Sequence, residues 1–164
     1  MSWVAILMGS DSDWPTMQST TSTLSDLGVK FEVKVTSAHR TPEATSAYVK
    51  DAESRGCDIF ICAAGLAAHL AGNVAAHTLK PVIGVPMDGG PFTGLDALLS
   101  TVQMPGGVPV ATVAVGKAGA KNAGYLAAQM LSLSDDALAT RLRDERKTNA
   151  QKIAKADAAV QESL

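Results

Sequence analysis

The segment that most constrains the fold is the almost wholly apolar run at residues 58–64, DIFICAA. A strand that is apolar along its whole length, rather than alternating with polar residues, is typical of a strand covered on both faces. Further strands are predicted at about 3–9, 30–36, 81–86 and 110–115, and helical segments separate them. Strands that alternate with helices in this way predict a parallel sheet joined by right-handed crossovers.

Helices complete the pattern. The first helix is predicted to run from the turn at 10–15 to Gly28, and the second from Pro42 to Gly56. A short helix is predicted to end at Leu79, and further helices at about 95–102 and 118–132. The last helix is predicted to begin at the capping residues 134–136 and to reach about residue 160. The predicted fold class is α/β, a three-layer α/β/α sandwich of the flavodoxin-like or Rossmann-like kind, with a parallel sheet and a long C-terminal helix. A chain of 164 residues fits one domain, 1–164. The last helix has balanced charge and a sparse apolar stripe, which predicts that it packs on a neighbouring subunit.

The composition excludes several classes of partner. The net charge is −2, which gives no indication of nucleic acid or an anionic membrane as a partner. No apolar run reaches the roughly 18 residues of a membrane span, and the segment beginning at Trp3 lacks the basic region of a signal peptide. Cys57 and Cys62 do not have a metal-ligand spacing, so they are interpreted as reduced structural thiols. His77 is interpreted as a structural residue in the middle of a helix. We therefore expect a cytoplasmic protein.

A helix start follows the predicted strand at 30–36. Thr41 suits the N-cap, Pro42 suits the first helical position and Glu43 suits the first turn. Backbone N–H groups point outward at such a start and the helix dipole favours anions, so this terminus is suited to binding phosphate.

Three side chains with complementary chemistry stand beside this helix start: Ser37, His39 and Arg40. Arg40 can bind a phosphate through two charge-assisted hydrogen bonds. A histidine titrates near neutral pH, so His39 can give or take a proton. The pattern predicts a phosphate anchor beside a proton carrier. An ordinary capped helix with an exposed His39 and Arg40 explains the same residues and stays open as the alternative.

Two further loops carry polar or small residues. In the loop at 9–13, one carboxylate, that of Asp11 or Asp13, can accept two hydrogen bonds from a ribose diol, and Ser10 can hold a polar substrate group. A tight turn with Ser12 or Asp13 as the N-cap is the alternative. The small and apolar residues at 63–72 surround His69, and they predict either a dry pocket wall or close helix–sheet packing.

The predicted topology brings these loops together. In open parallel sheets, ligands bind beyond the carboxyl ends of the strands, where the strand order reverses. The loops at 9–13, 36–41 and 64–73 follow the first three predicted strands, so we expect them to meet at that edge. This convergence is a stronger indication of a site than any one motif.

Several sequence blocks, taken together, are specific to one family. The blocks are 8–14 (MGSDSDW), 37–42 (SAHRTP), 67–70 (AAHL), 81–86 (PVIGVP), 103–112 (QMPGGVPVAT) and 116–123 (GKAGAKNA). In this order they resemble the class I PurE family along nearly the whole chain. Members of that family are N5-carboxyaminoimidazole ribonucleotide mutases of bacterial purine synthesis.

The resemblance implies a catalytic domain with a layered α/β fold, assembled as a homo-octamer and active without metal or organic cofactor. It implies a small phosphoribosyl substrate and no nucleic-acid or membrane partner. The reaction would be the isomerisation of N5-carboxyaminoimidazole ribonucleotide to 4-carboxyaminoimidazole ribonucleotide. The carboxylate would leave the exocyclic nitrogen as CO2 and be recaptured at ring carbon C4.

The matching motifs also imply roles for individual residues. Asp13 would contact the ribose hydroxyls, and Ser37 and Arg40 would bind the 5′-phosphate. The implied site residues are His39 as general acid and base and, for substrate binding, Ser10, Asp13, Ser37, Arg40, Ala64, Gly65, His69 and Leu70.

The chain departs from the family pattern at three positions. Members usually carry a second glycine where this chain has Leu66, and this substitution adds bulk where the backbone approaches the base. They usually read His-Leu-Pro-Gly-Met where this chain has Ala71 and Asn73. Class II relatives, which carboxylate aminoimidazole ribonucleotide with CO2 directly, typically have lysine after the motif histidine, so Arg40 favours class I.

Three alternatives to the mutase remain at this stage. Direct carboxylation with CO2 or bicarbonate uses the same chemistry. A phosphoribosyl-binding relative without turnover is suggested by Leu66. A signalling domain that resembles a response regulator would fit Asp11, Asp13 and Lys117, but the third predicted strand ends without the aspartate that such domains phosphorylate.

Overall fold

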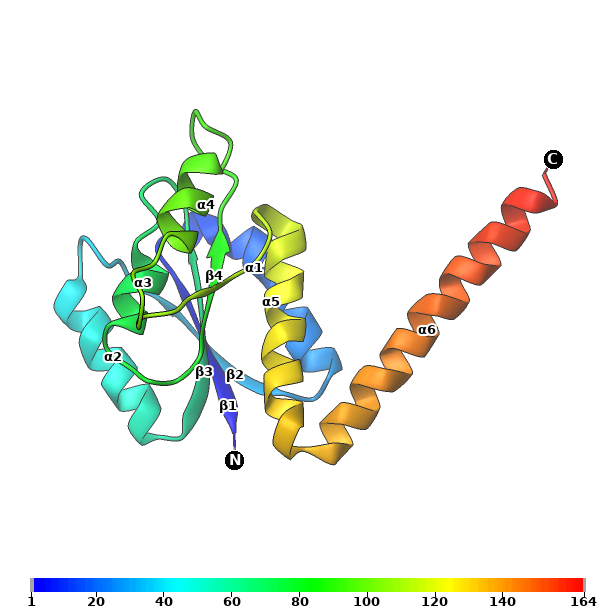
Figure 1. Ribbon diagram of the computed structural model, residues 1–164, viewed down its shortest axis with the longest axis horizontal. Coiled ribbons are helices and arrows are strands. Elements are labelled where there is room, and N and C mark those ends of the chain that lie inside the picture. The colour runs from blue at the N-terminus through cyan, green and yellow to red at the C-terminus, as the bar shows by residue number, and fades with distance from the viewer. Residues whose placement is uncertain (1, 164) are drawn as a thin grey trace.

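The computed structural model describes residues 2–163, and in this range five parallel strands form one sheet covered by helices (Figure 1). The strands are β1 (Trp3–Met8), β2 (Lys30–Val35), β3 (Cys57–Ala64), β4 (Val82–Pro86) and β5 (Ala111–Thr112). Their spatial order is β2-β1-β3-β4-β5, and every neighbouring pair is parallel. The order therefore reverses between β1 and β3, and the predicted α/β fold with a parallel sheet is confirmed.

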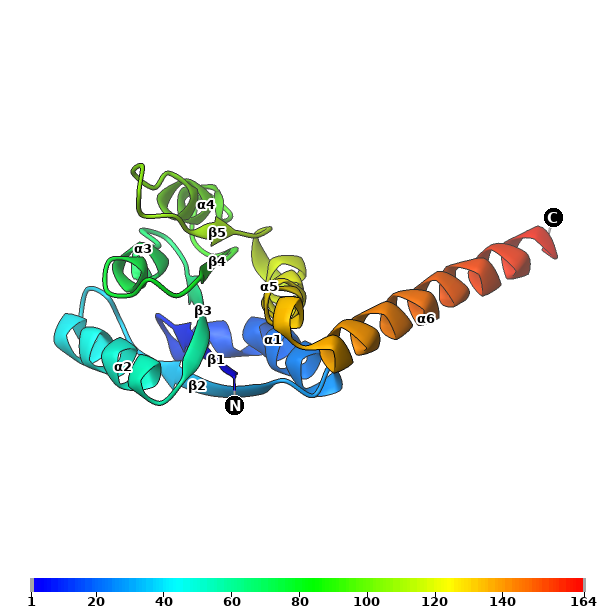
Figure 2. The same cartoon turned by 60° about the horizontal axis from the view of Figure 1, so that its bottom comes forward.

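Helices cover both faces of the sheet. They are η1 (Asp11–Asp13), α1 (Trp14–Asp26), α2 (Pro42–Ser54), α3 (Leu70–Ala75), α4 (Leu95–Val102), α5 (Gly116–Leu131), η2 (Ser132–Ser134) and α6 (Asp136–Gln161). Helices α1 and α5 pack on one face, while α2, α3 and α4 pack on the other (Figure 2). The result is the predicted arrangement of three layers.

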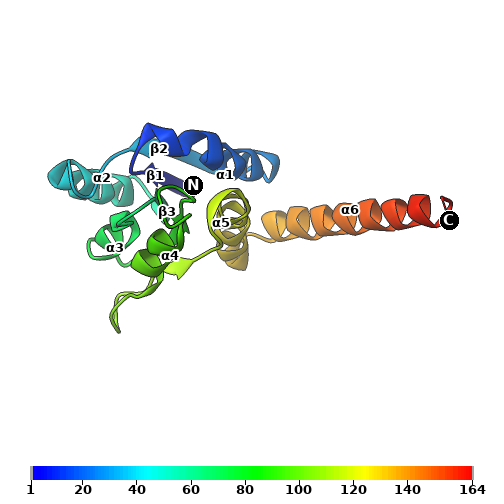
Figure 3. The ribbon, with the colours of Figure 1, turned by 90° about the horizontal axis from the view of Figure 1, so that it is seen from above.

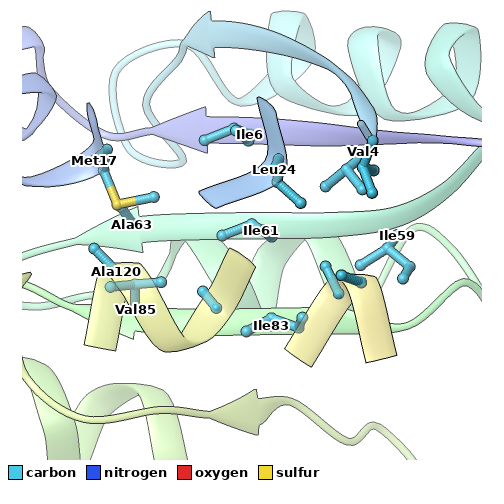
Figure 4. Packing of buried hydrophobic residues seen from close by; sticks show 14 of the residues in the cluster. Val4, Ile6, Met17, Leu24, Ile59, Ile61, Ala63, Ile83, Val85 and Ala120 are labelled. Carbon is cyan, nitrogen blue, oxygen red and sulfur yellow. The ribbon is translucent and has the colours of Figure 1, made fainter. Parts of the chain in front are cut away.

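The core on the α1 and α5 side is built from alternate residues of the inner strands. Val4 and Ile6 of β1 and Ile61 of β3 meet Met17 and Leu24 of α1 (Figure 4). The intervening residues of β1 point to the opposite face, where α2 and α3 cover them. Because both faces are covered, every residue of β1 is buried, as expected for a central strand of a parallel sheet.

Small residues allow α5 to approach α1 closely. A Cβ at Gly124 would lie only 3.0 Å from the Cβ of Thr23. The Thr20 hydroxyl donates a hydrogen bond of 2.6 Å to the backbone carbonyl of Ala120. The buried residues of α5 are all glycine or alanine: Gly116, Gly119, Ala120, Ala123, Gly124, Ala127 and Ala128. These small residues of α5 are therefore used for packing inside the chain.

Three elements differ from the sequence expectation. Strand β5 has two residues instead of about six, and it is an edge strand that pairs with β4. Helix α3 ends at Ala75, well before Leu79. His77 consequently lies in an exposed turn after the helix, so its assignment to the middle of a helix was wrong. The buried free thiols of Cys57 and Cys62 agree with their interpretation as reduced thiols.

Helix α6 projects away from the layered body as a long arm (Figures 1 and 3). Its start is defined, since the Asp135 carboxylate accepts a hydrogen bond of 2.9 Å from the N–H of Leu138, as the sequence predicts for a capping residue. Arg141 donates a hydrogen bond of 2.7 Å to the carbonyl of Leu27. Among the described residues of α6, only Leu138 is buried. In residues 2–163, no helix combines the length and apolar character needed to cross a membrane.

Candidate active site

One cavity of about 500 Å³ lies at the carboxyl ends of the inner strands. It is lined by the loops that follow β1, β2 and β3, which are the three loops that the sequence predicts to converge. All nine residues predicted for the site line it: Ser10, Asp13, Ser37, His39, Arg40, Ala64, Gly65, His69 and Leu70. The cavity lies where the strand order reverses, as expected for an open parallel sheet.

Hydrogen bonds between main-chain groups hold the strand ends that carry these loops. The N–H of Gly9 donates to the carbonyl of Ala63 at 3.0 Å, and the N–H of Thr36 donates to the carbonyl of Met8 at 2.9 Å. The loop after β1 is thereby tied to the strands on both of its sides. The positions of the side chains that follow are set by the sheet rather than by the loops alone.

A network of hydroxyl groups shapes the loop between β2 and α2. The buried Thr36 and Thr45 hydroxyls are 2.7 Å apart, which joins the end of β2 to the first turn of α2. The Ser37 hydroxyl accepts a hydrogen bond of 3.1 Å from the N–H of Arg40. These bonds fix the turn from which His39 and Arg40 project, so two exposed side chains sit on a rigid support.

The start of α2 agrees with the sequence in its positions but not in its capping bond. Pro42 and Glu43 occupy the first turn, and Thr41 is the N-cap residue. The Thr41 hydroxyl makes no capping bond, because it turns back to Ser37, accepting from the N–H at 3.0 Å and donating to the carbonyl at 3.1 Å. The Thr41 hydroxyl therefore closes the loop around Ser37 and does not bond to an N–H group of the first helical turn.

His39 and His69 come from different loops and meet in the cavity. Nε2 of His39 and Nδ1 of His69 are 2.8 Å apart, and the rings are arranged edge to face with centroids 4.9 Å apart. Such a bond needs one N–H and one lone pair, so one ring donates and the other accepts. The two rings are thus joined by one hydrogen bond inside the cavity.

Arg40 supplies positive charge to the same cavity. Among residues 2–163, no carboxylate forms an ion pair with its exposed guanidinium. An arginine without a protein partner can present its N–H groups to an anion. The hydroxyl of Ser37 lies in the adjacent part of the turn.

Asp13 lies at the end of η1, in the loop that follows β1. Partial burial is the main cause that raises the pKa of its carboxyl above the usual value, and the nearby Asp11 adds to this effect, while a hydrogen bond from the backbone of Ser10 opposes it. The Ser10 hydroxyl accepts hydrogen bonds from the N–H and the hydroxyl of Ser12, at 3.2 and 2.8 Å. Ser10 therefore caps η1, and Asp13 makes no capping bond at the start of α1.

Sequence reasoning missed one wall of the cavity. Met87, Gly89 and Gly90, from the loop between β4 and α4, also line it. The signal was present, because this Gly/Pro-rich loop follows a buried strand whose carboxyl end lies at the same edge of the sheet. Leu66 and Ala67 complete the wall on the β3 side.

Two larger hollows lie elsewhere and contain none of the predicted site residues. A groove of about 780 Å³ lies between α5 and α6, and a hollow of about 600 Å³ lies near His77. In residues 2–163, no group of three or more His, Cys, Asp or Glu side chains is arranged to hold a metal ion. The cavity with the two histidines is therefore the place where the predicted chemistry is concentrated.

Comparisons with known proteins point to one family. The sequence model of the AIR carboxylase family matches residues 3–152. The N5-carboxyaminoimidazole ribonucleotide mutase of Bacillus subtilis is 56% identical over 146 residues, which cover 89% of this chain and 90% of that protein. The Escherichia coli protein of the same name is 49% identical, over 92% of this chain and 89% of its own length. A crystal structure of Treponema denticola PurE superimposes with a TM-score of 0.88 at 32% identity, covering 97% of this chain and 98% of that chain.

Proposed function

Because this chain belongs to the AIR carboxylase family, we propose that it is an N5-carboxyaminoimidazole ribonucleotide mutase of purine biosynthesis. The observation that carries the assignment is that an imidazole, a guanidinium and a carboxylate line one cavity: those of His39, Arg40 and Asp13. The relatives that share about half of its sequence bear the name of this activity.

Polar groups from two loops of the cavity match two parts of the substrate. Arg40 and Ser37 bind the 5′-phosphate beside the start of α2, and Asp13, with Ser10, binds the ribose hydroxyls from the loop after β1. Ala64, Gly65 and Leu70 line the wall beside the base. Binding energy from the phosphate and the ribose then holds the base in register with the histidine pair.

His39 starts the reaction as a general acid. The substrate carries its carboxylate on an exocyclic nitrogen, and protonation of that nitrogen makes it a leaving group. The C–N bond breaks and CO2 is released, while His39 is left neutral. The remaining aminoimidazole is an enamine, so its ring carbon C4 is nucleophilic.

The second half of the reaction returns the proton. C4 attacks the CO2 beside it, and a C–C bond forms. C4 must then lose its hydrogen to restore the aromatic ring, and the neutral His39 accepts that proton. One imidazole therefore serves both halves, and the proton balance of the enzyme is zero.

His69 acts as a positioning residue in this scheme. At 2.8 Å from Nε2 of His39, its Nδ1 fixes the orientation of the reacting ring.

Transfer of an isotopic label tests the assignment. Substrate that carries ¹³C in its carboxylate is converted in unlabelled, low bicarbonate, and the product is analysed by mass spectrometry. The mutase predicts that the label stays in the product. Direct carboxylation predicts unlabelled product made from added bicarbonate, and a non-catalytic relative predicts binding without product.

We further propose that the protein is a cytoplasmic homo-octamer with one catalytic domain over 1–164. An exposed apolar stripe at Leu95, Leu99 and Val102 of α4, spaced by four and three residues, supports contacts between copies of the chain. The exposed Ile153 and Val160 on α6 support packing of this helix on a neighbour. Light scattering of the purified protein is expected to give eight times the mass of one chain, and the mass of a single chain would contradict the proposal.

A further inference from the structure

Leu66, in the turn between β3 and α3, adopts a backbone conformation that favours glycine. Its φ is +56°, and among residues 2–163 only Leu66 and Thr93 have a positive φ without being glycine. A leucine in this region crowds its own backbone, so the conformation persists only where the surroundings compensate for the strain. The hydrophobic core does not provide this compensation, because Leu66 is 53% exposed.

The Leu66 side chain instead packs across the rim of the cavity onto the loop between β4 and α4. Its Cδ2 lies so close to Gly90 that a Cβ at that position would be 2.3 Å away. Both residues line the cavity that contains His39 and His69. Leu66 thus joins two loops that are far apart in the sequence, and its aliphatic side chain forms part of the rim.

We propose that Leu66 is a positioning residue that closes the rim of the reaction cavity and retains CO2 between the two halves of the reaction. This inference rests on the mutase function proposed above. Carbon dioxide is small and uncharged, so the protein retains it mainly by blocking its exit. A branched aliphatic side chain supported by two loops blocks the exit without offering a polar group to water.

Retention of CO2 can be measured as a competition between recapture and escape. When C4 captures the CO2 that has just been released, the carboxylate of the product is that of the substrate. When CO2 escapes, aminoimidazole ribonucleotide remains, and any product formed later contains carboxylate from solution. A residue that only stabilises the turn affects stability or total turnover, whereas a residue that closes the rim changes the fraction of carboxylate lost.

Four variants separate the side chain from the backbone strain. Leu66→Ala and Leu66→Gly remove the side chain, and the glycine variant also removes the strain. Leu66→Met restores apolar bulk at the rim. Thr93→Gly is the matched control, because Thr93 has the same kind of strain, with φ +50°, but does not line the cavity.

The experiment uses the full-length protein and substrate labelled with ¹³C in its carboxylate. Unlabelled bicarbonate and carbonic anhydrase are added so that escaped CO2 mixes at once with the solution pool. Mass spectrometry measures the label in the product, a reaction without enzyme corrects for spontaneous loss, and thermal unfolding confirms that each variant is folded.

We expect Leu66→Ala and Leu66→Gly to raise the fraction of label lost by about threefold or more. Leu66→Met and Thr93→Gly are expected to lose as little label as the wild type. Equal loss in Leu66→Ala and wild type, with normal turnover, overturns the role of Leu66 and leaves the mutase assignment intact. Equal increases in Leu66→Ala and Thr93→Gly also overturn it, because they assign the effect to backbone strain. Wild-type product that contains no substrate label overturns the mutase assignment itself.

Discussion

The carboxyl end of the sheet and helix α6 are built on opposite principles. At the sheet end, loops from four strands surround one cavity, and hydrogen bonds such as that between the hydroxyls of Thr36 and Thr45 fix a strand end to the helix that follows it. Helix α6 is a single element of 26 residues with one buried side chain, Leu138 (Figure 1). Exposed side chains occur in both regions, but at the sheet end they project from loops of several strands that meet at one cavity.

This difference shows which exposed side chains of the chain are held in defined positions and can serve a function. His39 and Arg40 are exposed on a rigid turn, so their positions are defined although they contribute little to the core. Helix α6 has one buried residue, Leu138, near its start. Substitutions of exposed side chains at the sheet end should therefore change chemistry with little effect on stability, and substitutions on α6 should change stability or assembly.

The largest expected effect is that of His39→Asn. The proton carrier is lost, so kcat should fall by about 10²- to 10⁴-fold. Substrate binding and the melting temperature should stay close to wild type, because the ring is exposed. Steady-state kinetics and equilibrium binding measure the two effects, and His77→Asn is the matched control outside the cavity. Retained turnover in His39→Asn would remove this residue from its role.

The next effect concerns the single buried residue of α6. Leu138→Ala should destabilise the protein by about 2–5 kcal/mol, because it leaves a cavity under the start of the helix. Ile153→Ala on the same helix should change the stability of the separated chain by no more than about 0.5 kcal/mol, since Ile153 is exposed. Denaturant unfolding compares them, and equal losses would show that the distal half of α6 is packed against something in solution.

Arg40→Ala should weaken substrate binding by about 1.5–3 kcal/mol, the range for hydrogen bonds to a charged group. The loss is expected mainly in KM, and inorganic phosphate should compete less well with substrate. Arg143→Ala, an exposed arginine of α6, is the control and should leave both constants unchanged. Unchanged affinity in Arg40→Ala would defeat the assignment of the phosphate site.

The smallest expected effect is a dependence of stability on pH at Asp13. Burial raises the pKa of this carboxyl in the folded protein, so the folded state binds the proton more tightly than the unfolded chain. The ionised carboxylate therefore reduces stability at neutral pH, and this penalty disappears as the pH falls through the raised pKa. Asp13→Asn should stabilise the protein at pH 7 by no more than about 1 kcal/mol, allowing for screening by solvent.

Thermal unfolding of Asp13→Asn between about pH 7 and pH 4 should show the gain shrinking toward the acidic end. Asp157→Asn on α6 is the control, because Asp157 is fully on the exposed part of that helix. A gain that does not change with pH would mean that the carboxyl group of Asp13 is not the cause.

Much of the layered fold could be predicted from the sequence for a local reason. The apolar run at β3 and the alternation of strands with helices indicate which surfaces must be buried. A parallel sheet covered by helices buries them on both faces. The same rule places the ends of the strands at one edge, so the sequence alone brought the loops after β1, β2 and β3 together. The roles assigned to the residues in those loops remain predictions.

The tertiary structure decided the contacts between side chains that lie far apart in the chain. Three contacts depend on how separate elements are placed. They are the 2.8 Å bond between His39 and His69, the packing of Leu66 on Gly90, and the lining of the cavity by the β4–α4 loop. The return of the Thr41 hydroxyl to Ser37 is equally invisible in a capping pattern. Burial and backbone preference are encoded residue by residue, whereas a contact between two loops is set by the packing of every element that supports them.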